Sequence, residues 1–397
     1  MKRLQLIVTG LLLLLSSTIM AQNKKSFTLD DLMWGGSNYW NLQPKNISTA
    51  WWGDCLMQTE ADNVRILYNE KGKAAKGEVL FTTENINSQL DESKQGKVRD
   101  LRSARFPYPD RTEVLLETQK ASLIYDWKSG QVIWIQPRIS GLQANSFNPT
   151  SKARAFVKDW NLYVTTADGI THQVTTDGNR ELQYGMSVHR DEFGINKGTF
   201  WSPKGNLLAF YRMDQSMVTD FPLVDISHRV AQLAPEKYPM AGMTSHKVTV
   251  GIFNPATEKT TYLQAGDPTD RYFTNIAWSP DEKTLYVIEL PRTQDKAELV
   301  AYDAATGQRK EVLYTETNPR YVEPMNPIVF LPWDDTKFIY QTRRDGYNHI
   351  YLFDVKGKEL AQLTSGQYEV IDVLGFNTKT KSVIFKSNEA SPIRHNH

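Results

Sequence analysis

Two adjacent carboxylates, Asp191 and Glu192, are the side chains in this sequence whose types and spacing best suit joint chemistry. They lie in the run His189-Arg-Asp-Glu-Phe-Gly194, shortly before Trp201-Ser-Pro203. In a polar loop, an acidic pair is ordinarily a solvated surface feature. If the loop turned into a closed cavity, the two carboxylates would instead form a receptor for an ammonium group, with charge-assisted hydrogen bonds to its protons. The residues alone leave both interpretations open.

The usual machinery of catalysis is missing from the sequence. No Gly-x-Ser-x-Gly elbow, no His-Glu-x-x-His or Cys-x-x-Cys pairing and no glycine-rich phosphate loop occurs. We therefore predict no catalytic residue, no metal ligand and no cofactor in this chain. The histidines are interpreted as surface or structural residues because they are scattered along the sequence: His172, His189, His228, His246 and His349.

Composition narrows the class of protein further. The chain has 397 residues, abundant aromatic residues and a net charge of +1, which predicts a large buried core and gives no electrostatic sign of nucleic-acid binding. Cys55 is the single cysteine, so an intramolecular disulfide framework is excluded. No linker-like or strongly charged block interrupts the chain after its N-terminal region, which favours one large repetitive domain.

The N-terminus has the layout of a secretory signal peptide. Met1-Lys-Arg3 precedes an apolar run from Leu4 to Leu15, and small residues close the region at Ala21. The apolar run is shorter than the ~20 residues that span a bilayer. We predict a signal peptide at residues 1–21, export to the periplasm or medium, and no membrane span after cleavage. An N-terminal segment at residues 22–50 follows, in which Thr28 is placed to cap a short helix.

The rest of the chain is repetitive. Aromatic residues followed closely by proline or a turn recur at roughly the 40 to 50 residue period of four-stranded propeller blades, with one longer interval between Trp201 and Trp278 that predicts an insertion. The markers begin at Phe106, Phe147, Trp201, Trp278, Phe330 and Phe376.

Short β-branched and aromatic segments follow these markers, as in Thr284–Ile288 and Lys337–Gln341, and they predict strands rather than helices. The expected fold class is all-β: a β-propeller of four-stranded antiparallel blades. Because blades pack face to face, the rings of Trp201, Trp278 and Phe330 are expected to be buried between sheets.

The sequence resembles the dipeptidyl peptidase IV family of serine peptidases, in its N-terminal propeller region and bacterial type. The resemblance is dense from about Ser187 to Ser391, and it rests on five elements in order: Gly198–Asp214, Tyr238-Pro-Met-Ala-Gly242, Trp278-Ser-Pro280, Asp345-Gly-Tyr-Asn-His-Ile350 and Gln367-Tyr-Glu-Val370.

The resemblance implies an eight-bladed propeller that covers an α/β-hydrolase domain, with Asp191 and Glu192 gripping the free N-terminus of a peptide substrate. It also implies that Arg320 and Tyr321 lie along the substrate cleft. The intact protein is then expected to release X-Pro or X-Ala dipeptides by serine catalysis and to form a homodimer, with peptides and its own hydrolase domain as partners.

The expected propeller, residues 51–397, is interpreted as incomplete: about seven blades are present, the hydrolase domain is absent, and Ser391 to His397 is expected to provide no closing strand. The chain alone is therefore predicted to be inactive. Two alternatives remain from the sequence, a non-enzymatic periplasmic binding or scaffold propeller and the propeller of a related oligopeptidase.

Overall fold

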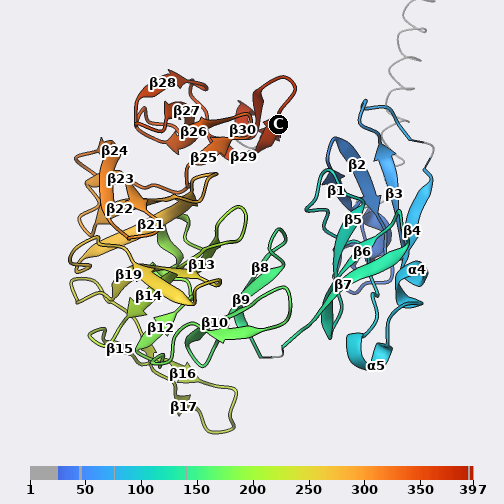
Figure 1. Cartoon of the computed structure of the whole chain (residues 1–397), viewed down its shortest axis with the longest axis horizontal. Helices are drawn as coiled ribbons and strands as arrows, with labels where there is room; N and C mark the ends of the chain where they lie inside the picture. Colours follow the sequence, from blue (N-terminus) through green and yellow to red (C-terminus); the bar gives the residue numbers. More distant parts are fainter. Residues whose placement is uncertain (1–25, 44–46, 76, 140, 392–393, 397) are drawn as a thin grey trace, which may run out of the picture. The chain divides into compact units, whose positions relative to one another are not determined.

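In the computed structural model the chain divides into two compact units, residues 1–135 and residues 136–397. The structure describes residues 26–43, 47–75, 77–139, 141–391 and 394–396, so the predicted signal peptide lies outside the described residues. Regular structure is mostly antiparallel β (Figure 1), which confirms the all-β prediction. In the described part of the chain, no helix is long and apolar enough to cross a membrane.

Among the described residues, short helices occur only in the first unit, apart from one 3-10 segment described below. Thr28 is the N-cap of the first helix, and its amide and hydroxyl donate to the Asp31 carboxylate at 2.8 and 2.9 Å. This confirms the expected cap. The helices are α2 (Leu29–Leu32), α3 (Tyr39–Leu42), α4 (Thr83–Asn87) and α5 (Glu92–Gln95).

Two sheets form most of the first unit. They pack through one apolar cluster in which the Trp127 ring stacks on Phe81 at 5.7 Å and the Cys55 thiol is buried. The last residues of β7 extend into the second unit. The strands are β1 (Thr49–Trp52), β2 (Cys55–Thr59), β3 (Asn63–Tyr68) and β4 (Val79–Thr82), then β5 (Glu113–Glu117), β6 (Ala121–Asp126) and β7 (Gln131–Pro137).

The second unit is a succession of sheets that follow one another in sequence order, from green to red in Figure 1. The first sheet has β8 (Gln143–Asn148), β9 (Ala153–Lys158), β10 (Asn161–Thr165) and β11 (Thr171–Gln173). The second has β12 (Leu182–Tyr184), β13 (Thr199–Trp201), β14 (Leu208–Asp214), β19 (Lys247–Asn254) and β20 (Lys259–Tyr262).

The remaining sheets of this unit repeat the same meander. The third has β21 (Arg271–Trp278), β22 (Thr284–Pro291), β23 (Lys296–Asp303) and β24 (Arg309–Thr317). The fourth has β25 (Val329–Leu331), β26 (Asp334–Thr342), β27 (His349–Asp354) and β28 (Glu359–Gln362). The last described sheet has β29 (Val370–Asn377), β30 (Ser382–Ser391) and β31 (Arg394–Asn396).

Successive sheets of the second unit share apolar clusters. One cluster joins Val157 of β9 to Phe210 of β14, and the next joins Val250 of β19 to Val287 of β22. A third joins Ile288 of β22 to Phe338 of β26. A four-stranded sheet cannot bury both faces alone, so each sheet needs its neighbour. The antiparallel sheets packed in this way are the blades of a β-propeller.

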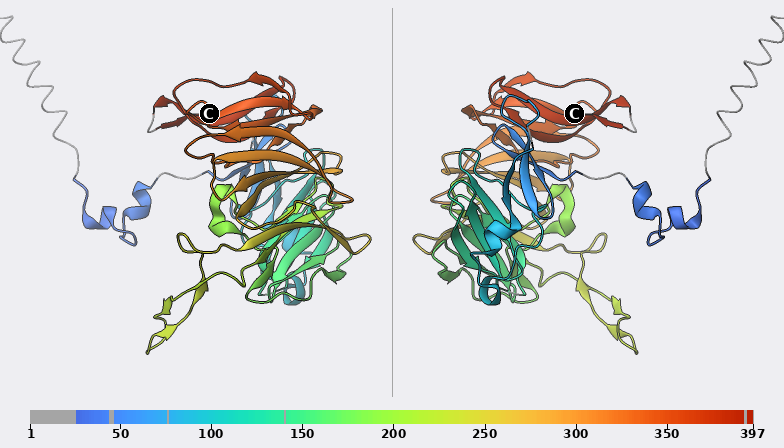
Figure 2. Two further views of the ribbon diagram at one scale, coloured as in Figure 1. Left: turned by 90° about the vertical axis from the view of Figure 1, so that its left-hand side faces the viewer. Right: turned by 90° about the vertical axis from the view of Figure 1, so that its right-hand side faces the viewer.

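The insertion predicted between Trp201 and Trp278 lies between β14 and β19. It contains two short two-stranded ribbons and extends away from the sheets of the second unit, as Figure 2 shows in yellow-green. Several of its apolar side chains are exposed, including Ile226 and Val230. The ribbon strands are β15 (Asp220–Phe221), β16 (Val224–Asp225), β17 (Gln232–Leu233) and β18 (Glu236–Lys237).

The predicted burial of the marker rings is confirmed for Trp278, which is 8% exposed and donates its indole N–H to the Phe200 carbonyl. Trp201 and Phe330 pack against the clusters between sheets but are only half-buried. For these two rings the prediction of full burial was wrong. All three rings line an open hollow of about 850 Å³, and Trp278 is the most deeply buried of them.

The last described residues add a strand to the final sheet. Residues Arg394–Asn396 form β31, which pairs antiparallel with its sequence neighbour β30. The sequence predicted that Ser391 to His397 provides no strand that closes the propeller. A pairing of β31 with β30 inside one sheet does not test that prediction, which stays a prediction.

Candidate functional site

The predicted acid pair lies on η1 (His189–Gly194), a 3-10 segment between β12 and β13. Its backbone is irregular, because His189, Arg190, Asp191 and Phe193 have φ values of 53° to 65°. Non-glycine residues avoid this left-handed region at a cost of about 1–2 kcal/mol each. Contacts with the surrounding structure must therefore hold the segment in place.

Phe193 is the first of these contacts. Its ring is buried in the cluster between the third and fourth sheets and meets the Tyr272 ring edge-to-face at 4.9 Å. The Thr274 hydroxyl donates to the Phe193 carbonyl at 3.1 Å. Both partners belong to β21, so the C-terminal half of η1 is fixed to that strand.

Gly194 closes the segment at a position that only glycine fits. Its φ is 71°, and a Cβ atom placed there would lie 2.1 Å from the Met325 carbonyl oxygen. The absence of a side chain thus allows η1 to lie directly against the segment that precedes β25.

His189 provides the anchor at the other end of η1. Its ring packs edge-to-face on Tyr272 at 4.6 Å and stacks on the His246 ring at 4.6 Å. His246 Nε2 lies 2.9 Å from His189 Nδ1 and accepts the His189 backbone N–H at 3.1 Å. Both side chains are buried, at 3% and 6% exposure. Both histidines are therefore hydrogen-bonded structural residues, in agreement with the interpretation from the sequence, which did not identify them as partners.

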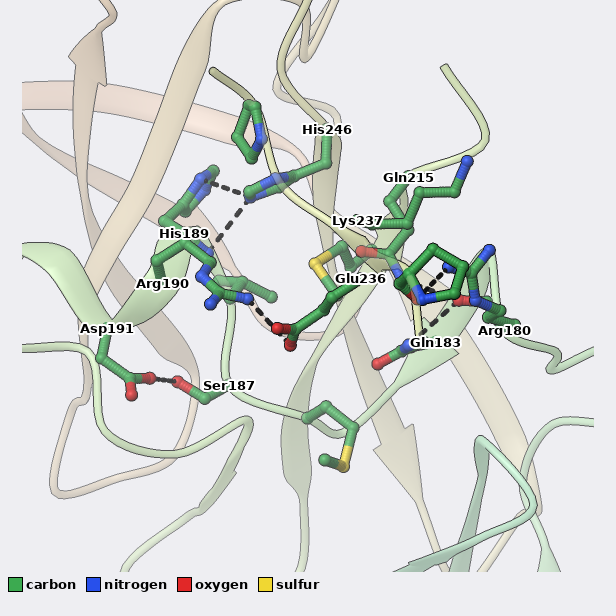
Figure 3. Close-up of a pocket in the computed structure, with 15 residues that line it drawn as sticks. Arg180, Gln183, Ser187, His189, Arg190, Asp191, Gln215, Glu236, Lys237 and His246 are labelled. Atoms are coloured by element: carbon green, nitrogen blue, oxygen red, sulfur yellow. Dashed lines mark hydrogen bonds and ion pairs between the residues drawn. The ribbon is translucent and has the colours of Figure 1, made fainter. Parts of the chain in front are cut away.

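Asp191 and Glu192 are both exposed, but their surroundings differ. Asp191 accepts a hydrogen bond from the Ser187 hydroxyl and lines a cavity of about 490 Å³ between η1 and the insertion (Figure 3). Glu192 does not line that cavity. Burial raises the pKa of Tyr272, and the negative charge of the nearby Glu192 carboxylate adds to this rise.

Neither carboxylate forms an ion pair in the described part of the chain. The adjacent cation, Arg190, is directed to the insertion, where it pairs with Glu236 at 3.2 Å and lies over the Tyr238 ring at 5.1 Å. Figure 3 shows Arg190 turned toward Glu236 and Asp191 turned toward Ser187. The negative charges of Asp191 and Glu192 therefore remain available to a ligand cation.

Arg320 and Tyr321, the predicted cleft residues, are exposed and line a second cavity of about 290 Å³. Their segment continues to Val322, which shares a buried cluster with Phe193. Farther along, the Pro324 carbonyl accepts from the Asn275 amide at 2.8 Å. The structure thus brings the segment of Arg320 and Tyr321 against the segment of the acid pair, although the four side chains line different surfaces.

Within the described residues, no group of three or more potential metal-ligating side chains is close enough to hold an ion. The arrangement offers negative charge, hydrogen-bond acceptors and cavities next to each other. Carboxylate oxygens of this kind can form charge-assisted hydrogen bonds to a cationic ligand.

The fold and the sequence place this chain in a known class. The family model "Dipeptidyl peptidase IV (DPP IV) N-terminal region" matches residues 108–397. The chain therefore belongs to the family of dipeptidyl peptidase IV N-terminal regions, and the family predicted from the sequence is confirmed.

Curated proteins similar in sequence to this chain have names that fit this family. The chain is 28% identical over 282 residues to the "Probable dipeptidyl-aminopeptidase B" of Arthroderma otae, covering 64% of this chain and 31% of that protein. It is 26% identical over 283 residues to the "Probable dipeptidyl peptidase 4" of Aspergillus fumigatus, covering 67% and 37%. The chain thus spans about a third of the length of these curated relatives.

Solved structures give the same result. A crystal structure described as "a putative dipeptidyl aminopeptidase IV from Bacteroides ovatus" is 47% identical, with a TM-score of 0.83 over 92% of this chain and 53% of that one. The dipeptidyl peptidase 4 of Porphyromonas gingivalis has the same fold, with a TM-score of 0.71 at 24% identity, covering 94% and 54%.

The relation that sequence reasoning missed is the pairing of His246 with His189. His246 follows Tyr238-Pro-Met-Ala-Gly242, one of the elements that carried the resemblance, and it precedes β19. Its partner at His189 was not visible, because the intervening insertion has to fold back before the two rings meet.

Proposed function

We propose that this chain is the substrate-gating and N-terminus-anchoring propeller of an exported serine dipeptidyl peptidase that releases X-Pro or X-Ala dipeptides from peptide N-termini. Asp191 and Glu192 would bind the substrate ammonium group, and Arg320 with Tyr321 would line the cleft that receives the peptide. The catalytic serine would belong to the hydrolase part of the intact protein. We also propose that the intact protein forms a homodimer.

The observation that carries the proposal is the pair of exposed, unneutralised carboxylates on a segment held in left-handed geometry. Strained backbone that persists at considerable cost is characteristic of functional segments. A substrate ammonium that leaves water needs fixed anionic oxygens to replace its hydrogen bonds. The cavity beside Asp191 gives such a ligand room.

The test uses this chain with Ala-Pro as the probe and N-acetyl-Ala-Pro as the matched ligand without a charged amine, followed by nuclear magnetic resonance titration. Ala-Pro is expected to perturb the signals of η1, and N-acetyl-Ala-Pro to bind at least tenfold more weakly. Asp191→Asn and Glu192→Gln should each weaken Ala-Pro binding by about 10- to 100-fold, because a hydrogen bond to a charged group contributes about 1.5–3 kcal/mol.

Glu311→Gln is the matched control, since Glu311 is an exposed carboxylate on β24 away from η1. Equal binding of the acetylated and free peptides would support a related oligopeptidase instead. If neither peptide binds, the scaffold alternative is favoured. The chain itself is expected to release no product from Ala-Pro substrates, because it contains no activated nucleophile.

A further inference from the structure

His189 and His246 form a buried pair whose hydrogen bonds allow one arrangement of protons. The His189 backbone N–H can only donate, so His246 Nε2, which receives it at 3.1 Å, is an unprotonated acceptor. The short contact at 2.9 Å then requires His189 Nδ1 to carry the donated proton. His246 accordingly holds its own proton on Nδ1, and both rings are neutral.

This arrangement has no place for an additional proton. A proton on His246 would occupy Nε2 and remove both hydrogen bonds to His189. A proton on His189 would occupy its Nε2, which is buried without a hydrogen-bond partner in the described part of the chain. Either event places an uncompensated charge in the interior, which is costly.

The charged neighbours increase this cost. Arg190 of η1 and Arg292, which follows β22, both disfavour a positive charge on His246. Burial, assisted by these two arginines, lowers the pKa of His246 to about 4, and burial with the neighbouring His246 ring lowers the pKa of His189. The other titratable or charged groups facing the pair or its cavity are Tyr272 of β21, Asp191 and Glu192 of η1, Arg180 before β12, and Glu236 and Lys237 of β18.

The pair fixes the start of the segment that carries the acids. The His189 ring lies between His246 and Tyr272, and the next two residues, Arg190 and Asp191, have left-handed backbone. Phe193 anchors only the far end of η1. Without the His246 acceptor, the near end would lose the contact that holds His189 in its strained conformation.

We propose that His246 is a positioning residue for Asp191 and Glu192, and that the neutral histidine pair is an acid-sensitive latch whose protonation releases η1. One part of this proposal rests on the proposed function: the expectation that release of η1 weakens the binding of a free N-terminal amine. The latch itself is a property of the chain and can be measured without any peptide.

The pH direction follows from the lowered pKa values. In the unfolded chain both histidines bind protons below their ordinary pKa of about 6.5. In the folded chain the pKa of His246 is lowered to about 4, and burial lowers the pKa of His189 in the same direction. The contribution of the pair to stability is therefore complete above pH 6.5 and is lost progressively as the pH falls toward 4.

The experiment compares wild type with His246→Gln, His246→Ala and His172→Gln by nuclear magnetic resonance between pH 7.5 and 4. Glutamine retains an acceptor for the His189 N–H but does not titrate, and alanine removes the acceptor. His172 lies on β11 beside Glu258 and serves as a histidine control away from η1. The ring signals of Phe193 and Tyr272 report on η1.

In the wild type and in His172→Gln, the Phe193 and Tyr272 signals are expected to change together with the His246 ring nitrogens on acidification. His246→Gln should lack this transition, and His246→Ala should show the released state already at pH 7.5. At pH 7.5, His246→Ala should bind Ala-Pro about tenfold more weakly than the wild type, a loss typical of removing a supporting partner, while His246→Gln stays within about twofold.

A transition that persists unchanged in His246→Gln, or ring signals that do not follow the His246 nitrogens, would overturn the latch. If His246→Ala does not fold, the comparison of wild type with His246→Gln still decides the question. Loss of discrimination between Ala-Pro and N-acetyl-Ala-Pro in the wild type, together with an intact transition, would reject the proposed function and support the latch.

Discussion

Carboxylates occur in two contrasting settings in the second unit. Glu289, on β22, is 5% exposed. Its carboxylate forms ion pairs with Arg271 at 2.5 Å and Arg309 at 3.3 Å and accepts a hydrogen bond from the Tyr302 hydroxyl. Asp191 and Glu192, on η1, are exposed and form no ion pair among the described residues, although Arg190 lies beside them in the chain.

The difference separates a carboxylate whose oxygens are occupied by protein cations from two carboxylates that form no ion pair with the protein. A buried charge is tolerated only when partners replace its lost hydration, so Glu289 has its oxygens occupied. An exposed carboxylate needs no such partner, but holding it on strained backbone has a cost without an evident structural return. Glu289 is thus part of the framework, whereas the acid pair is free to serve the binding role that we propose for it.

The largest expected effect is on the framework side of this comparison. Glu289→Ala should lower the free energy of unfolding by about 3 kcal/mol, near the lower end for a broken buried ion pair, because the Arg271 and Arg309 side chains still reach solvent. Urea unfolding measures the loss. Glu311→Ala, at an exposed position on β24, is the control, and an equal effect in both variants would remove the distinction.

A smaller but more local effect is expected at Gly194. Gly194→Ala combines a left-handed φ, which costs about 1–2 kcal/mol, with a clash of the new methyl group against the Met325 carbonyl. Gly169→Ala is the matched control, because Gly169 has a φ of 87° and open space around its Cβ position.

Urea unfolding should show a larger loss of stability for Gly194→Ala than for Gly169→Ala, and only Gly194→Ala should weaken Ala-Pro binding. If the two alanine variants lose equal stability and bind the peptide equally well, the contact between η1 and Met325 has no role in holding the acids.

The smallest expected effect concerns the stability of the acid variants. Asp191→Asn and Glu192→Gln should change the free energy of unfolding by no more than about 0.5 kcal/mol, as surface substitutions usually do. The same urea series measures this. A loss of 2 kcal/mol or more in either variant would assign that carboxylate to the framework, alongside Glu289.

Much of the fold was predictable because strand patterns and blade periods are local properties of the chain. Thr284–Ile288 and Lys337–Gln341 lie within β22 and β26, as expected, and the long interval after Trp201 contains the predicted insertion. The order of the short motifs was sufficient to indicate the family. Apolar alternation and turn residues act within a few positions, so they can be read without knowing any distant contact.

The geometry of the candidate site required the tertiary structure. The sequence identified Asp191 and Glu192 as neighbours, but only packing against β21 and the insertion makes Asp191 line a cavity that Glu192 does not line. Left-handed backbone at His189 and Arg190 is not signalled by glycine or asparagine at those positions.

The pairing of His189 with His246 likewise depends on an insertion that folds back across many residues. Sequence by itself determined the strands, the repeat and the family, because these follow from residue types taken a few at a time. Tertiary structure alone decided which distant side chains meet, because burial and strain are settled only when the sheets pack together.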